Sequence, residues 1–227
     1  YLYIGKGNNT EFKFSILEYQ NVNRLEFFLD SGNLKELILI SESKIQNSYI
    51  NYPFGIEETK RSTIQTLDFI WLKSKTKGTL YMNKNSQRFI LNKENNEIRN
   101  ILPNKDNYEF AILITNEKEE KHPLHYVNCY NFKLMGIMTN LDLNKQSESF
   151  LTLDGEGYID VVNLWKRKDK IYLRLLNPNN REEKVVIKGK LVKKILKELD
   201  LNYNLISSLK SNVIDMKPWE IKTIQLG

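Results

Sequence analysis

The stretch YEFAILI at residues 108–114 decides the fold, because its apolar side chains recur at every second position. A period of two places these side chains on one face of a β-strand. Burying that face requires a second sheet or a layer of helices. The same alternation returns in four further runs: Phe12, Phe14 and Ile16; Leu25, Phe27 and Leu29; Leu67, Phe69 and Trp71; and Ile171, Leu173 and Leu175.

Turn-forming segments rich in Gly, Pro, Asn and Asp separate these runs. They are Asp30-Ser31-Gly32-Asn33, Lys77-Gly78, Asp154-Gly155-Glu156-Gly157 and Asn177-Pro178-Asn179-Asn180. Short strands with such separators predict an all-β chain built as an antiparallel β-sandwich with little helix. A polar stretch at residues 140–148 predicts a boundary between a larger β-sandwich region at 1–143 and a smaller C-terminal β-sandwich region at 144–227.

One segment has helical spacing. Within residues 190–200 the apolar positions are Leu191, Val192, Ile195, Leu196 and Leu199, and Lys and Glu fill the opposite face. This pattern predicts one amphipathic helix. A turn and a strand remain the alternative, because the preceding Val185-Val186-Ile187 is clearly β-like.

Composition limits the class of protein. The 227 residues are 41% hydrophobic and 27% charged, and no apolar run approaches the length of a membrane span. The first residues lack a Met and a secretion signal, so we expect the chain to be a segment of a longer protein. A single cysteine, Cys129, favours the cytoplasm over a secreted location. The 34 basic and 28 acidic residues are spread thinly, which argues against a nucleic-acid partner.

The residue types that carry catalysis form no recognisable motif. His122 and His125 flank Pro123 without further ligands nearby, so we expect a solvated loop rather than a metal site. Cys129 stands alone and is expected to be a small buried core residue. No nucleophile elbow or phosphate loop occurs. The carboxylate pairs Glu57-Glu58, Asp154/Glu156 and Glu119-Glu120 do not have the arrangement of a glycosidase dyad and are expected at the surface.

One segment has features of a binding loop that a purely structural segment would not need. It reads YPFGIEETKR at residues 52–61, and the apolar strand IQTLDFIWLK follows at 64–73. Pro and Gly favour a bend, and two acids and an arginine follow closely. The loop could present Arg61 to sugar hydroxyls or to a carboxylate. An internal Glu–Arg ion pair explains the same residues equally well.

Several segments, in this order and spacing, resemble the C-terminal β region of family 38 glycoside hydrolases, the α-mannosidases. The first three are the segments at 52–61 and 64–73 and LYMNKNS at 80–86. Near the end come FLTL at 150–153, VVNLWK at 161–166, IYLRLLNP at 171–178 and MKPWEIKTIQL at 216–226. The resemblance departs at Trp165, where a smaller residue is common, and at 190–200, where the family would suggest a strand and a turn.

The resemblance implies a retaining α-mannosidase whose zinc ion and Asp nucleophile lie in an N-terminal α/β domain outside this chain. This chain would then hold no cofactor of its own and would not hydrolyse mannosides alone. Its implied work is to pack on that catalytic domain and to close one wall of the pocket for a mannose-containing carbohydrate. Arg61, Glu58 and Tyr52 are the residues we expect to bind substrate, and no nucleic acid or membrane is expected as a partner.

Two other classes remain open. A free-standing carbohydrate-binding module would also be a β-sandwich and would display exposed aromatic rings, for which Trp71, Trp165 and Trp219 are the candidates. Each of them lies within or beside an apolar strand, so burial in the core is the expected outcome. A purely structural or assembly protein is the third class.

Overall fold

A computed structural model of the chain describes residues 2–3, 13–18, 23–30, 35–41, 43–53, 55–84, 88–102, 107–116, 121–132, 149–192 and 195–226. It divides into two compact units, one of Tyr1–Pro53 with Glu57–Leu134 and one of Phe54–Ile56 with Met135–Gly227. We call them the N-terminal and the C-terminal unit. The predicted boundary at 140–148 lies outside the described residues and stays a prediction.

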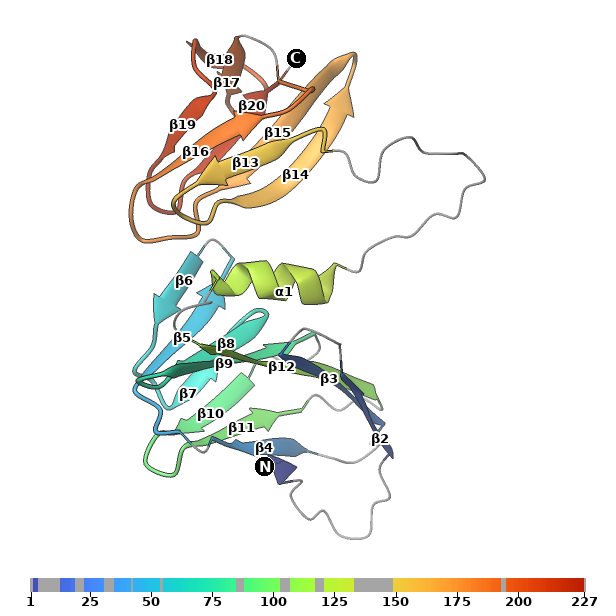
Figure 1. Ribbon diagram of the computed structural model, residues 1–227, viewed down its shortest axis with the longest axis vertical. Coiled ribbons are helices and arrows are strands. Elements are labelled where there is room, and N and C mark those ends of the chain that lie inside the picture. Colours follow the sequence, from blue (N-terminus) through green and yellow to red (C-terminus); the bar gives the residue numbers. More distant parts are fainter. Residues whose placement is uncertain are drawn as a thin grey trace. The chain divides into compact units, whose positions relative to one another are not determined.

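The N-terminal unit is built from two antiparallel sheets (Figure 1). The smaller sheet has the order β1 (Leu2–Tyr3), β4 (Glu36–Ile40), β11 (Glu97–Ile101), β10 (Arg88–Asn92) and β7 (Thr63–Gln65). The larger sheet has the order β2 (Lys13–Glu18), β3 (Arg24–Asp30), β12 (Asn107–Asn116), β9 (Lys77–Asn83), β8 (Phe69–Lys73), β5 (Asn47–Tyr52) and β6 (Gly55–Glu58). The strand predicted from YEFAILI is the central part of β12, and the sandwich is confirmed.

Aromatic rings fill the core between these sheets. Phe110 stacks on Phe27 and Tyr81, with ring centroids 4.6 and 5.3 Å apart. The buried hydroxyls of Tyr81 and Tyr108 lie 3.2 Å apart, and the Asn100 amide donates to both. Burial raises the pKa of Tyr81 well above its ordinary value, so its hydroxyl stays protonated. The two tyrosine hydroxyls and the Asn100 amide therefore supply hydrogen-bond partners to one another inside the core.

A helix occurs where a loop was expected. The segment that begins at His122 forms α1 (Pro123–Asn131), which lies against β9 and buries Pro123, Val127 and Tyr130. Proline suits the first turn of a helix because the N–H that it lacks has no partner there in any case. The buried residues are spaced as in a helix. The pattern is hard to recognise in the sequence because a proline and two histidines interrupt the apolar positions. The expectation of a solvated loop was wrong.

The C-terminal unit is a second, smaller sandwich (Figure 1). One sheet has the order β13 (Thr152–Gly155), β16 (Glu183–Lys188) and β19 (Val213–Met216). The other has the order β14 (Asp160–Arg167), β15 (Lys170–Leu176), β20 (Ile221–Gln225), β17 (Leu196–Leu199) and β18 (Leu205–Leu209). The core includes Leu173, Leu175, Ile187, Ile214 and Ile224.

The helix predicted within residues 190–200 is wrong. Gly189, at φ +130°, follows the end of β16, and Leu196–Leu199 then forms β17 between β18 and β20. Leu196 and Leu199 are both buried although they point to opposite faces of the strand. A strand covered on both faces can place apolar residues three positions apart, which imitates helical spacing. The strand suggested by the family resemblance is confirmed.

One smaller expectation also changes. Lys77-Gly78 belongs to the start of β9 instead of a turn, and the turn precedes it, where Ser74 N donates to Lys77 O. The described part of the chain contains no helix long and apolar enough to cross a membrane.

Candidate functional site

A buried amide holds the end of β5, where the first candidate residue lies. The Asn51 side-chain oxygen accepts hydrogen bonds from Asp68 N at 3.0 Å and Phe69 N at 3.2 Å. Its amide nitrogen donates to Asp68 Oδ2 at 2.9 Å. The Thr66 hydroxyl lies 2.8 Å from the same amide oxygen. Asn51 therefore ties the end of β5 to the segment that leads into β8.

A second set of hydrogen bonds holds residues 58–61. Thr59 N donates to Ser48 O at 2.8 Å, and the Ser48 hydroxyl donates to Thr59 O at 2.7 Å. The Asn47 amide donates to Glu58 Oε1 at 2.8 Å. Arg61 N donates to the Thr59 hydroxyl at 3.3 Å. The backbone that carries Glu58 and Arg61 is thus attached to β5 at several points.

The three predicted substrate-binding residues all lie at the surface of this segment. Tyr52, the last residue of β5, is 41% exposed, and Glu58 and Arg61 are exposed as well. Among the described residues no hydrogen bond joins one of the three to another, and Arg61 has no ion pair. Among the residues that the structure describes, no Glu–Arg ion pair forms within this segment, and Glu58 accepts a hydrogen bond from Asn47.

Replacing Asn51 with alanine is expected to lower the free energy of unfolding by about 2 kcal/mol, because it leaves Asp68 N and the buried Phe69 N without their acceptor. Urea unfolding measures this change. Asn107→Ala, at an exposed position of the same unit, is the control and should change stability by less than about 0.5 kcal/mol. Equal effects of the two substitutions would contradict a holding role for Asn51.

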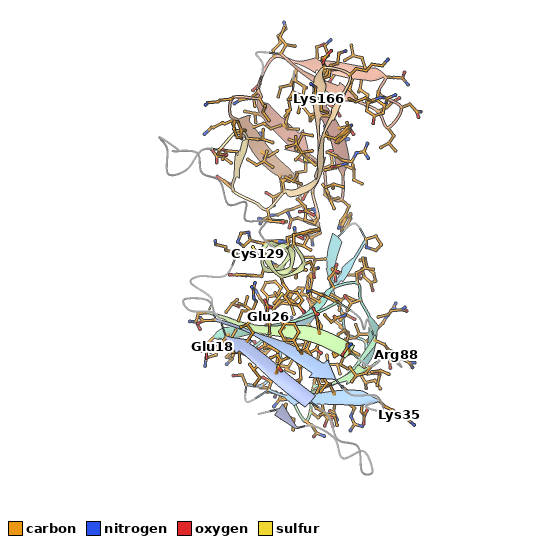
Figure 2. All side chains as sticks on the ribbon, turned by 90° about the vertical axis from the view of Figure 1, so that its right-hand side faces the viewer. Glu18, Glu26, Lys35, Arg88, Cys129 and Lys166 are labelled. Carbon is orange, nitrogen blue, oxygen red and sulfur yellow. The ribbon has the colours of Figure 1, made fainter. Side chains whose placement is uncertain are left out.

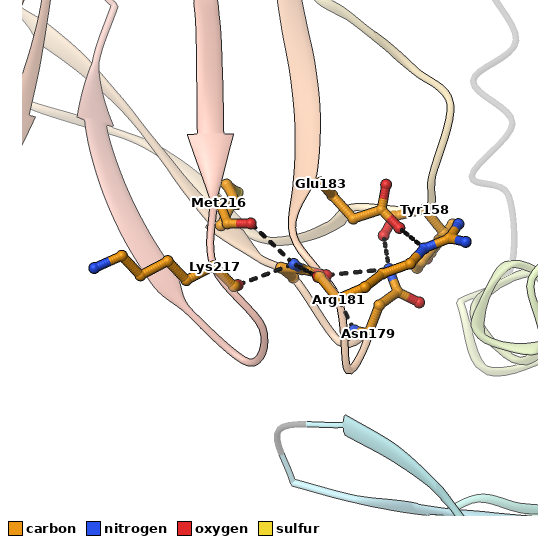
Figure 3. A network of polar contacts seen from close by, with 7 residues as sticks. Tyr158, Asn179, Arg181, Glu183, Met216 and Lys217 are labelled. Carbon is orange, nitrogen blue, oxygen red and sulfur yellow. Dashed lines mark hydrogen bonds and ion pairs between the residues drawn. The ribbon is translucent and has the colours of Figure 1, made fainter.

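In the C-terminal unit the buried side chain of Asn177 organises the loop after β15, and its partners Arg181, Met216 and Lys217 are labelled in Figure 3. Its amide nitrogen lies within hydrogen-bond distance of three backbone carbonyls, Arg181 O at 2.8 Å, Lys217 O at 2.9 Å and Met216 O at 3.2 Å. Its amide oxygen accepts from Asn179 N at 3.0 Å. One side chain therefore joins the β15–β16 loop to the end of β19.

The same loop carries an ion pair at its surface (Figure 3). Arg181 Nε donates to Glu183 Oε1 at 2.7 Å, and this contact raises the pKa of the arginine. Glu183 is buried, whereas Arg181 is mostly exposed. Gly157 makes room for the carboxylate, because a Cβ there would lie 1.9 Å from Glu183 Oε2. The arrangement positions a guanidinium at the surface but leaves its carboxylate engaged.

The histidines and Cys129 form no reactive group in the described part of the chain. No cluster of three or more His, Cys, Asp or Glu residues that could hold a metal ion occurs there. Partial burial and the nearby Lys121 lower the pKa of His125. Cys129 is exposed, so the expectation of a buried core residue was wrong. Of the carboxylate pairs, Glu119-Glu120 lies outside the described residues, and Asp154 pairs with Lys188 at 2.6 Å.

The tryptophans are less buried than expected. Trp71 and Trp165 are half-buried, and Trp219 is 54% exposed with its backbone in the left-handed region at φ +55°. Burial of Trp219 in the core was therefore a wrong expectation. Trp165 belongs to an aromatic cluster with Tyr172 and Tyr203, which the sequence analysis did not identify. The rings of Trp165 and Tyr172 meet because β14 pairs with β15, and a predicted hairpin between these two strands could have indicated this contact.

Comparison with known proteins gives a family match for the C-terminal unit. Residues 158–224 match the model of the glycosyl hydrolases family 38 C-terminal beta sandwich domain. No curated protein matches the chain by sequence.

Two solved structures from Enterococcus faecalis have a similar fold. An α-mannosidase matches with a TM-score of 0.74 and 11% identity, over 96% of this chain and 29% of that chain. A protein in glycosyl hydrolase family 38 matches with a TM-score of 0.69 and 11% identity, over 96% of this chain and 30% of that chain. At this identity the likeness concerns the fold, and the chain spans less than a third of either structure.

Proposed function

We propose that the chain is the non-catalytic β portion of an α-mannosidase-like glycoside hydrolase, because residues 158–224 match the model of the C-terminal beta sandwich domain of glycosyl hydrolases family 38. The match of the C-terminal unit to this domain is the observation that carries the proposal. The similar fold over 96% of the chain extends the support to the N-terminal unit. The partner is then a catalytic domain of the same protein, for which the chain provides a packing surface.

The zinc ion that the resemblance implies does not fit the described residues, because they contain no cluster of three potential metal ligands. In the proposal the ion and its ligands belong to the catalytic domain.

The proposal assigns Arg61, Glu58 and Tyr52 to one wall of the sugar pocket. Support comes from their exposure together with the hydrogen bonds that hold their backbone. A guanidinium with a fixed backbone and no ion pair among the described residues can donate to adjacent sugar hydroxyls. Tyr52 adds an exposed ring at the end of β5, and the Asn47 amide holds the Glu58 carboxylate.

An assay of hydrolysis tests the proposal. The chain alone is expected to release no nitrophenol from para-nitrophenyl α-mannoside, whereas the longer protein that contains it should hydrolyse this substrate. Hydrolysis by the chain alone would contradict the non-catalytic role. A longer protein that is folded but inactive on α-mannosides would contradict the proposed parent activity.

Replacing Arg61 with alanine in the longer protein is expected to lower kcat/KM for the aryl mannoside by about tenfold, the loss of one charged hydrogen bond to substrate. Expression and melting temperature should stay unchanged, because the side chain is exposed. Arg88→Ala, at another exposed arginine of the N-terminal unit, is the matched control and should keep wild-type kinetics. Wild-type kinetics in the Arg61 variant would remove Arg61 from the pocket.

A further inference from the structure

Three aromatic rings form a cluster on the outer face of the five-stranded sheet of the C-terminal unit. Trp165 and Tyr172 are register partners on β14 and β15, and their rings stack with centroids 5.5 Å apart and planes 19° apart. Tyr203 meets Tyr172 edge-on at 5.4 Å. Leu173 and Leu175 point into the sandwich core, so Tyr172 points away from it. Trp165 and Tyr203 keep part of their surface exposed.

A strained turn holds Tyr203 in this position. Its backbone has φ +69°, a left-handed conformation that is unfavourable for a non-glycine residue. The Asp200 carboxylate stabilises the turn by accepting hydrogen bonds from Asn202 N and Asn204 N, both at 2.8 Å, and from the Asn204 amide. These hydrogen bonds, with the Asn204 side chain first, lower the pKa of Asp200. Strain of this kind gathers at functional sites.

Two guanidinium groups flank the rings. Arg167 lies 4.2 Å from the centroid of Tyr203, and Arg174 lies 5.3 Å from the centroid of Trp165. Arg174 Nε donates to the Thr223 hydroxyl at 3.2 Å, which leaves its two terminal nitrogens directed elsewhere. Within the described ranges neither arginine has a carboxylate partner. Fixed guanidinium donors without an acid favour an anionic ligand.

The charge of the adjoining hairpin supports the same chemistry. From the end of β14 to the start of β15 the chain reads Lys166-Arg167-Lys168-Asp169-Lys170, four cationic residues and one acid. Lys166, labelled in Figure 2, lies 3.6 Å from Asp169, and both side chains are strongly exposed. An exposed pair of this kind is weak and does not neutralise the hairpin.

We propose that Trp165, Tyr203, Arg167 and Arg174, supported from below by the buried ring of Tyr172, bind a saccharide that carries an anionic group. The partly exposed rings contact the apolar face of a sugar ring, and the two guanidinium groups bind the anion. The choice of a saccharide rests on the proposed function, whereas the choice of an anion rests on the two arginines. The short hairpin offers no extended basic groove for a nucleic-acid backbone.

Titration of the chain, followed by tryptophan fluorescence, tests this proposal. The probes are a phosphorylated mannose oligosaccharide, the same oligosaccharide without phosphate, inorganic phosphate and oligothymidylate. The phosphorylated saccharide should bind about tenfold or more tightly than each of the others. The proposal would be overturned if the neutral saccharide or inorganic phosphate bound as tightly as the phosphorylated saccharide. Tighter binding of oligothymidylate would also overturn it, as would the absence of binding by the phosphorylated saccharide.

Variants locate the site. Arg167→Gln and Trp165→Leu should each weaken binding of the phosphorylated saccharide by about tenfold. Arg88→Gln, at an exposed arginine of the N-terminal unit, is the control and should bind as the wild type does. Because Arg167 is exposed, its variant should fold even where Trp165→Leu does not, and unchanged binding by the Arg167 variant would overturn the proposal.

The outcome is separable from that of the proposed function. If the longer protein hydrolyses the mannoside but this chain binds no saccharide, the binding role of the aromatic cluster is ruled out and the proposed function stands. If this chain binds the saccharide but the longer protein is inactive, the proposed parent activity is ruled out and the binding role of the cluster stands.

Discussion

Replacing Phe110 with alanine is expected to lower the free energy of unfolding of the N-terminal unit by about 3–5 kcal/mol. The side chain is fully buried and contacts the rings of Phe27, Tyr81 and Tyr108. Its removal leaves a cavity at the centre of the core, because rings that are held between two sheets cannot collapse into the space. A decrease of this size is a large fraction of the free energy of unfolding of an ordinary domain.

Urea unfolding followed by far-ultraviolet circular dichroism measures this loss. Phe132→Ala is the matched control, because Phe132 belongs to the same unit and is 73% exposed. It should change the free energy of unfolding by less than about 0.5 kcal/mol. A loss below about 1 kcal/mol for the Phe110 variant would contradict its place at the centre of the aromatic core.

Replacing Asn177 with alanine is expected to lower the free energy of unfolding of the C-terminal unit by roughly 3 kcal/mol. The substitution leaves the buried carbonyl of Met216 and the neighbouring carbonyls of Arg181 and Lys217 without the shared donor (Figure 3). Each buried polar group left without a partner costs about 1–3 kcal/mol. Because the side chain joins the β15–β16 loop to β19, the loop that carries Arg181 should also become mobile.

Two measurements check this second expectation. Urea unfolding reports the stability, and amide hydrogen exchange reports the opening of residues 177–183. Asn163→Ala, at an exposed position of β14, is the matched control and should leave both unchanged. If Asn177→Ala exchanges at the wild-type rate in that loop, Asn177 does not organise it.

The fold was largely predictable because alternation along a strand records burial on one face. The run at residues 108–114 predicted β12, and the run at 171–175 predicted β15. The same rule failed for β17, which is covered on both faces and therefore lacks alternation. It failed for α1 because the helix is short, and its buried positions include a proline and a tyrosine.

The candidate sites were less predictable. The sequence indicated Tyr52, Glu58 and Arg61 as one group because they are close along the chain, but the hydrogen bonds that hold this segment come from Asn47, Ser48 and Asn51 of β5. Exposure of Trp219 and Cys129 was also missed, since an apolar residue within an apolar segment gives no information about which face is covered.

By itself the sequence determined the class of fold and the resemblance that the family match of residues 158–224 supports, because strand periodicity and local motifs are properties of neighbouring residues. Only the tertiary structure decided which distant residues meet. Tyr203 contacts the rings of Trp165 and Tyr172 edge-on because strand pairing and a left-handed turn bring the three residues together. Asn177 reaches Met216 and Lys217 for the same reason, since hydrogen bonds between remote segments depend on sheet register, which no local pattern encodes.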